Sequence, residues 1–164
     1  MTMVIVIHAT AATLSLVLGA VNLARRPKGD RRHRLVGRVW VVAMYLAVLT
    51  SFAIREVNPG GFSWLHGLSA FTLVTLTVGW VAALRGRIET HRGFLRGSYV
   101  GTVAAFVGAV VVPQRAVPRL AVDHPWLLSV AAAAVLAVAW LVVALAGRPV
   151  RRRDVLISEA RVPR

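Results

Sequence analysis

The sequence predicts an all-α membrane protein with five transmembrane helices, and three observations lead to that fold class. Hydrophobic residues make up 57% of the 164 residues, whereas only 16% are charged. The apolar residues lie in long runs, and a helix needs about 20 of them to cross a bilayer. The runs show no regular alternation of apolar and polar residues, which argues against the strands of a membrane barrel.

Five runs have the required length, and short connections separate them. The expected spans cover residues 3–24, 35–54, 62–84, 94–112 and 126–147. The fourth is the shortest and contains Arg96 near its start. Asp30 follows a Pro-Lys-Gly turn and is a suitable N-cap for the second helix, because its side chain can accept a bond from a free backbone N–H.

The basic residues predict the orientation of the spans. The chain has 20 Lys and Arg against 6 Asp and Glu. Residues 25–38, 85–96 and 148–164 hold seven, four and six of the basic residues, and the opposite side holds three. Because positive loops remain in the cytoplasm, we expect the N-terminus outside and the C-terminus inside. The predicted organisation is a single transmembrane domain over residues 1–147 and a basic cytoplasmic tail over residues 148–164.

The composition also indicates where the protein is located and what it contacts. Basic loops beside apolar spans favour the anionic headgroups of the lipid bilayer, and no nucleic-acid-binding motif accompanies them. The chain is rich in Arg, Ala and Val, which is typical of a bacterium with a GC-rich genome, so we expect the bacterial inner membrane. Cysteine is absent, which excludes disulfides and thiolate metal sites.

An offset of 58 residues aligns the sequence with itself and predicts a duplicated helical hairpin. The aligned pairs are His8 with His66, His33 with His91, Arg34 with Arg92, and Arg38 with Arg96. Repeat A then covers residues 3–54 and repeat B residues 62–112, and together they form a four-helix core. The fifth helix, residues 126–147, has no equivalent. Parallel repeats are related by an axis along the membrane normal, so each histidine pair should share one depth.

The residues around these histidines resemble a known family. The segments that carry the resemblance are His-Arg-Leu-Val-Gly-Arg-Val-Trp at 33–40, Phe-Ser-Trp-Leu-His-Gly-Leu-Ser at 62–69, His-Arg-Gly-Phe-Leu-Arg-Gly-Ser-Tyr-Val-Gly at 91–101 and Pro-Gln-Arg at 113–115. They are similar to the bacterial multi-pass proteins grouped as domain of unknown function 2306. The resemblance covers roughly residues 4–120 and omits the fifth helix. Leu95 and Gln114 depart from the family pattern, where methionine and glycine are expected. The resemblance implies a membrane location and helical hairpins, and it implies no reaction.

The favoured hypothesis for the histidines is haem b. Two imidazoles on facing helices can supply both axial ligands of a haem, so His8 with His66 and His33 with His91 would form an outer and an inner site. The outer pair is favoured over the inner pair, because lipid phosphates and water at the cytoplasmic boundary can satisfy His33 and His91 without a cofactor. Arg34, Arg38, Arg92 and Arg96 would pair with the haem propionates, because guanidinium groups suit carboxylates. Such a layout is similar to that of cytochrome b561-type electron carriers, with an electron donor and acceptor that the sequence does not identify.

Other interpretations stay open. The histidines can be neutral and structural, in a non-enzymatic membrane protein such as a small transporter or an accessory subunit of a membrane complex. A copper or zinc ion is less favoured, since neither span adds a carboxylate or thiolate to the two imidazoles. No catalytic residue is predicted, because the chain has neither a nucleophile elbow nor paired carboxylates. Whether the protein is an enzyme, and its oligomeric state, are left undecided.

Overall fold

The computed structural model describes residues 2–54, 61, 64–111, 122–123 and 125–147. The described residues form five long helices and no strand. These are α1 (Thr2–Ala24), α2 (Arg31–Ser51), α3 (Trp64–Leu84), α4 (Ile88–Val111) and α6 (Pro125–Gly147). Each is long and apolar enough to span a bilayer, which confirms the predicted fold class. The basic tail, residues 148–164, lies outside the described residues.

Two helices begin earlier than the apolar runs indicate. α2 begins at Arg31, four residues before the expected start, because Asp30 caps it by accepting a 2.8 Å bond from the backbone N–H of His33. α4 begins at Ile88, six residues early, directly after a turn in which Gly86 has a φ of 71°. Hydropathy marks only the part of a helix that lies in hydrocarbon, so it misses polar first turns. His33 and His91 consequently lie within helices.

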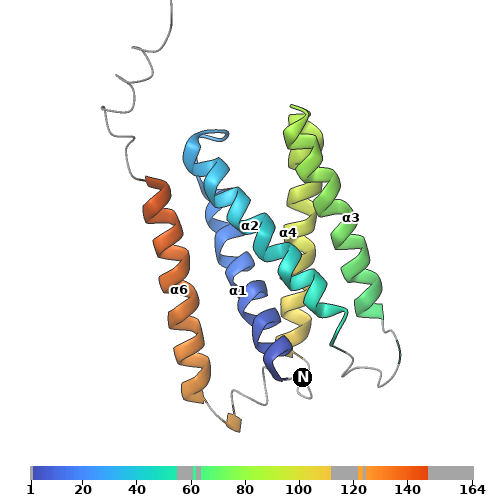
Figure 1. The fold of residues 1–164 in the computed structure, drawn as a ribbon, viewed down its shortest axis with the longest axis vertical. Helices are drawn as coiled ribbons and strands as arrows, with labels where there is room; N and C mark the ends of the chain where they lie inside the picture. Colours follow the sequence, from blue (N-terminus) through green and yellow to red (C-terminus); the bar gives the residue numbers. More distant parts are fainter. Residues whose placement is uncertain (1, 55–60, 62–63, 112–121, 124, 148–164) are drawn as a thin grey trace, which may run out of the picture.

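The first four helices form a ring. α1 packs against α2, α3 packs against α4, and the two hairpins meet where α2 contacts α3 and where α1 contacts α4. In this ring α1 lies diagonally opposite α3, and α2 lies diagonally opposite α4. α6 packs on the outside against α1 and α2 (Figure 1). The predicted four-helix core with one additional helix is therefore what the structure contains.

The centre of the bundle is held by close packing around one glycine. The indole N–H of Trp40 donates to the carbonyl of Ser15 at 2.9 Å, and the Tyr99 hydroxyl donates to the carbonyl of Leu16 at 3.3 Å. Both aromatic rings lie over Gly19, where a Cβ atom would come within 2.5 Å of the Tyr99 ring. α1, α2 and α4 approach one another here because Gly19 has no side chain. Small residues permit such contacts in membrane bundles.

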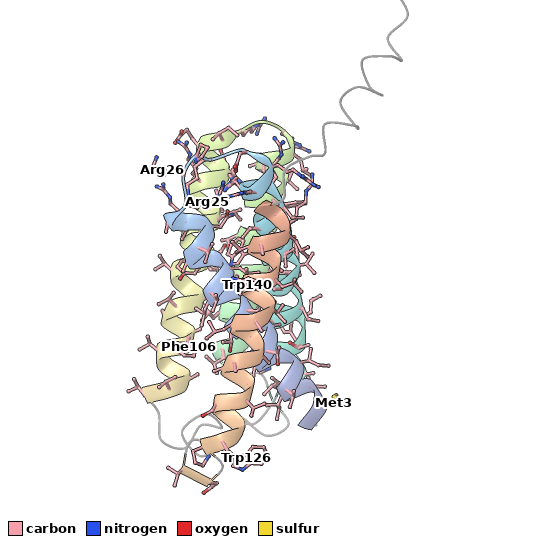
Figure 2. The ribbon with its side chains drawn as sticks, turned by 90° about the vertical axis from the view of Figure 1, so that its left-hand side faces the viewer. Met3, Arg25, Arg26, Phe106, Trp126 and Trp140 are labelled. Carbon is pink, nitrogen blue, oxygen red and sulfur yellow. The ribbon has the colours of Figure 1, made fainter. Side chains whose placement is uncertain are left out.

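Apolar and basic side chains occupy different parts of the bundle along its length. Large apolar side chains face outward over most of each helix, as Phe106, Trp126 and Trp140 show (Figure 2). Basic side chains gather at one end, where Arg25 and Arg26 lie (Figure 2). We call this the arginine-rich end. It contains the α1–α2 connection and the α3–α4 connection, residues 25–30 and 85–87. An apolar belt with one basic end is the pattern of a protein that spans a bilayer.

Candidate functional site

Two histidines from different hairpins meet at the arginine-rich end. His33 is in the first turn of α2 and His91 is in the first turn of α4. Their ring centres are 6.4 Å apart and the ring planes are at 87°. Both side chains are half-buried. The two residues stand 58 positions apart, so the structure brings together one of the two pairs that the sequence repeat singles out.

Each of these rings is fixed by a hydrogen bond within its own hairpin. The His33 Nδ1 donates to the side-chain oxygen of Asn22 at 3.0 Å, and the His91 Nδ1 donates to the backbone carbonyl of Gly79 at 3.1 Å. Because these oxygens only accept, Nδ1 carries the hydrogen in both rings. In a neutral imidazole the other nitrogen, Nε2, then has a free lone pair. The pair therefore presents two oriented imidazoles with the tautomer that metal-binding histidines usually have.

The other pair, His8 and His66, lies toward the opposite end of the bundle. The His8 Nδ1 donates to the carbonyl of Ala47 at 2.8 Å and lies 3.3 Å from the hydroxyl oxygen of Thr50. His66 is 6% exposed, and its ring centre is 6.2 Å from that of Phe52. Both histidines therefore lie at the C-terminal end of α2: His8 contacts its last turns, and His66 lies beside Phe52, which follows its last residue. The structure gives a direct ring contact for His33 with His91, and contacts to this shared segment for His8 and His66.

The four arginines assigned to the site lie on α2 and α4 near the arginine-rich end. Arg34 donates to the carbonyl of Gly29 at 2.9 Å, and Arg92 contacts the Glu89 carboxylate at 3.2 Å. Arg38 and Arg96 are exposed. These guanidinium groups surround the end of the bundle that holds His33 and His91, and they make it strongly positive.

The α1–α2 connection adds charges to the same end. Arg25 binds both carboxylate oxygens of Asp30, each at 2.6 Å. This guanidinium and the backbone N–H of His33 hold the pKa of Asp30 well below its usual range. Burial lowers the pKa of Lys28, and nearby arginines, among them Arg96 of α4, lower it further. The connection thus lies close enough to α4 for the two hairpins to share one cationic surface.

The residues between the two histidine levels are mostly apolar. Leu18, Met44 and Leu76 are fully buried there, together with Trp40. One buried polar contact joins α3 to α4, where the Thr75 and Ser98 hydroxyls are 3.0 Å apart. Within the described part of the chain, no group of three or more His, Cys, Asp or Glu residues could hold a metal ion.

Sequence reasoning missed the partners that orient the site. Asn22 stands on the polar side of α1, but its role as acceptor for His33 depends on how α1 turns against α2. Its equivalent 58 residues later is Trp80, so His91 uses a backbone carbonyl instead. Every residue has a carbonyl, so no sequence signal could identify Gly79.

The fold and the site define a class of protein: a five-helix transmembrane protein whose four-helix core carries histidines on each of its helices. The chain belongs to the family of predicted membrane proteins designated domain of unknown function 2306, whose model matches residues 5–147. The match confirms the resemblance and corrects its extent, because it includes the fifth helix that the resemblance left out. A search of curated proteins found no match, and a search of solved structures found none either.

Proposed function

We propose that this chain is a transmembrane electron carrier that binds haem b between paired histidines, with His33 and His91 as the better supported pair. The observation that carries the proposal is the 6.4 Å separation of their ring centres. At this separation His33 and His91 would hold one haem iron between them, and the haem would supply one-electron redox chemistry.

The hydrogen bonds of the pair support the same ligand role. Axial histidines present Nε2 to the metal and donate Nδ1–H to an oxygen, which fixes the ring and raises the basicity of the ligand. His33 and His91 have this arrangement through Asn22 and Gly79.

The two imidazoles are suitable ligands for haem iron, but side chains packed beside them fill space that the porphyrin would need. Two glycines near the pair offer flat surfaces, but side chains cover both. Trp40 and Tyr99 lie over Gly19, and Leu95 lies 2.5 Å from a Cβ placed on Gly79. A bound porphyrin needs space beside the two rings, so these side chains must turn away when haem enters.

The basic residues support a role at a membrane surface. Arg34, Arg38, Arg92 and Arg96 offer guanidinium groups for the haem propionates or for anionic lipid headgroups. The proposal places the arginine-rich end in the cytoplasm of a bacterium and the N-terminus outside, since positive loops are retained inside. His8 and His66 would then hold a second haem nearer the outer face. The distance between the levels, about 21 Å along the 14 residues of α1 from His8 to Asn22, is consistent with two separate sites.

Difference spectroscopy tests the proposal. The full chain would be purified in mild detergent from haem-supplemented cells, and its reduced-minus-oxidised absorbance recorded. We expect Soret and α-bands. His33→Ala and His91→Ala should each remove the signal of the same haem, whereas His124→Ala, which changes a histidine outside both pairs, should leave the spectrum unchanged. A protein without these bands, even after haem is added, would overturn the proposal.

The hydrogen bonds of the histidines also favour a second function. The three Nδ1 bonds join helices within hairpins: His8 and His33 link α1 to α2, and His91 links α3 to α4. Histidines with this role would be structural, in a small transporter or an accessory subunit of a membrane complex. In that case the unmodified protein shows no haem spectrum, and His91→Ala lowers its free energy of unfolding. The two measurements on one variant separate the two functions.

A further inference from the structure

The two hairpin connections at the arginine-rich end use their basic residues differently. In the α1–α2 connection, Arg25 binds the Asp30 carboxylate, and Lys28 donates to two backbone carbonyls at the end of α1 at 2.6 and 2.7 Å. In the α3–α4 connection, the side chains of Arg85 and Arg87 form no hydrogen bond or ion pair with any residue that the structure describes. These two residues, the arginine pair, are therefore available to an anion from outside the chain.

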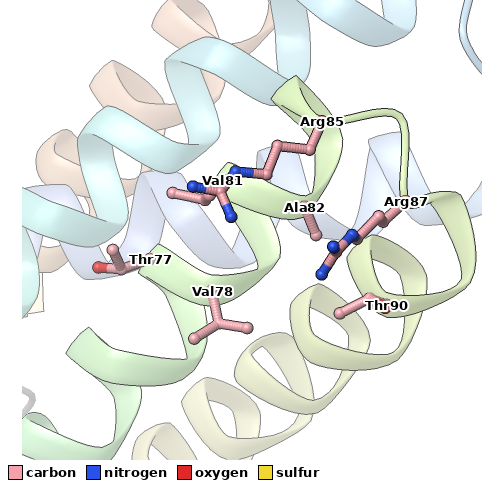
Figure 3. A pocket seen from close by; sticks show the side chains of 7 residues that line it. All are labelled: Thr77, Val78, Val81, Ala82, Arg85, Arg87 and Thr90. Carbon is pink, nitrogen blue, oxygen red and sulfur yellow. The ribbon is translucent and has the colours of Figure 1, made fainter.

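The arginine pair lines a hollow of about 260 Å³ on the outside of α3 and α4 (Figure 3). Figure 3 shows both arginine side chains extending from the α3–α4 turn along the hollow. Thr90 is half-buried at the same end, and within the described part of the chain its hydroxyl has no hydrogen-bond partner. The remaining lining residues all come from α3 and are Thr77, Val78, Val81 and Ala82. The hollow thus has a cationic end and a mainly apolar wall.

The first hairpin has no such cationic pair. The positions 58 residues before the arginine pair are Pro27 and Gly29, and neither carries a charge. Thr90 corresponds to Arg32, whose guanidinium donates to the end of α6. The repeat therefore places a helix beside one hairpin, and two cations around a hollow on the other.

We propose that this hollow binds one anionic phospholipid, with its phosphate between Arg85 and Arg87 and an acyl chain along Val78 and Val81. Guanidinium groups match the geometry of phosphate oxygens and form strong, charge-assisted hydrogen bonds with them. The Thr90 hydroxyl adds a further donor beside the headgroup. The proposal does not depend on haem binding.

The order of groups along the hollow favours a lipid over a soluble anion. Arg85 directly follows the span that ends at Leu84, so it lies at the membrane boundary. Val78 stands seven residues earlier on α3, about 10 Å along the helix, and belongs to the part that crosses the hydrocarbon. A phospholipid has the same order, with its charge at the boundary and its chains in the hydrocarbon.

The size of the hollow favours the same ligand. Pockets that enclose a small molecule usually have about 300–1,000 Å³, and this hollow has only about 260 Å³. It can therefore hold only part of a larger molecule. A lipid meets this condition, because the rest of its surface stays in contact with the bilayer.

The charge of the arginine pair favours a phosphate over the end of another helix. The C-terminus of a helix carries only about half a negative charge. In this protein such an end binds one guanidinium, that of Arg32. A phosphodiester carries a full negative charge and can accept hydrogen bonds from both members of the arginine pair.

Native mass spectrometry of the full chain in mild detergent tests the cationic end of the site. Delipidated protein would be titrated with phosphatidylglycerol, and we expect one tightly bound lipid per chain. Arg87→Gln should raise the dissociation constant about tenfold, the loss expected for one hydrogen bond to a charged group. Arg26→Gln is the matched control, since it removes an exposed arginine at the same end that does not line the hollow. Equal losses in both variants would overturn the proposal, because the basic end would then bind headgroups without a distinct site. Phosphatidylcholine with the same chains should bind more weakly, and equal affinity for the two lipids would also overturn it.

A second pair of variants tests the apolar wall. Val78→Trp places a large side chain in the hollow and should weaken binding of phosphatidylglycerol, whereas Val74→Trp changes an exposed valine of α3 that does not line it. Circular dichroism of each variant confirms that the helices are intact. Inorganic phosphate distinguishes a lipid from a free anion, and we expect it to displace the lipid only at concentrations far above those of the lipid itself. Full lipid affinity in Val78→Trp would contradict the proposal, and so would inorganic phosphate that binds as tightly as the lipid.

Discussion

Gly19→Ala tests the packing that joins three helices at the centre of the bundle. The new methyl group would lie 2.5 Å from the Tyr99 ring and 2.8 Å from the Trp40 indole nitrogen. Moving either ring breaks a hydrogen bond, because Tyr99 donates to the Leu16 carbonyl and Trp40 donates to the Ser15 carbonyl. The substitution therefore forces α1 away from α2 and α4, or breaks one of these bonds.

The expected loss of stability can be estimated from these contacts. Overpacking a filled core costs typically about 1–3 kcal/mol. Displacing Trp40 also leaves its N–H without its partner, at a cost of about 1 kcal/mol. Alanine gains about 0.5–1 kcal/mol over glycine within a helix, which offsets part of this loss. Gly67→Ala has the same helical gain and meets no neighbouring atom. The free energies of unfolding of the two variants should therefore differ by about 2–4 kcal/mol.

Reversible unfolding in mixed detergent and dodecyl sulfate micelles measures this difference. Tryptophan fluorescence or helical circular dichroism would follow the transition. Tyr99→Leu combined with Gly19→Ala should recover part of the loss, because it removes the ring nearest to the new methyl group. If Gly19→Ala is as stable as Gly67→Ala, the close packing around Gly19 does not exist and the reasoning is refuted.

Three further predictions concern the arginine-rich end. Arg32→Ala should release the end of α6, seen as faster proteolysis after Gly147, while Arg26→Ala serves as the control at the same end; equal rates would contradict the capping role. Since the folded-state pKa of Asp30 is depressed, its contribution to stability is present above the unfolded value near pH 4 and is lost as the pH falls below it. A stability profile that is flat down to pH 5, declines below pH 4, and loses this acid step in Asp30→Asn is the expected result; an unchanged acid step in the variant would count against it. Asn22→Ala frees the His33 ring and should weaken haem retention about 10–100-fold, the usual cost of losing such a partner; undiminished retention would show that Asn22 does not position the ligand.

Several features of the fold could be predicted from local sequence. The five spans follow from apolar length alone, because the thickness of the hydrocarbon sets how many residues a helix needs. Asp30 could be predicted as an N-cap because capping depends only on neighbouring backbone groups. The early starts of α2 and α4 were missed because their first turns are polar and leave no hydropathy signal.

The candidate site was predicted only in outline. The repeat singled out His33 and His91. Their position at the expected cytoplasmic boundary, where water and lipid phosphates can satisfy them, made them weaker candidates than His8 and His66. The ring contact between them depends on α2 and α4 lying diagonally across the ring of helices. No local pattern contains that information.

By itself, the sequence determined the number of spans, the basic end, the paired histidines and the family of this protein. Each of these depends on composition or on spacing along the chain. Only the tertiary structure decided that Asn22 and the Gly79 carbonyl orient the histidines, that Trp40 and Tyr99 close over Gly19, and that α6 covers one hairpin and leaves the other open. The physical reason is that lipid is as apolar as the helices, so hydrophobicity does not choose their partners. Shape complementarity, small residues and a few hydrogen bonds determine which helices pack together, and these interactions form only between helices that are already in the membrane.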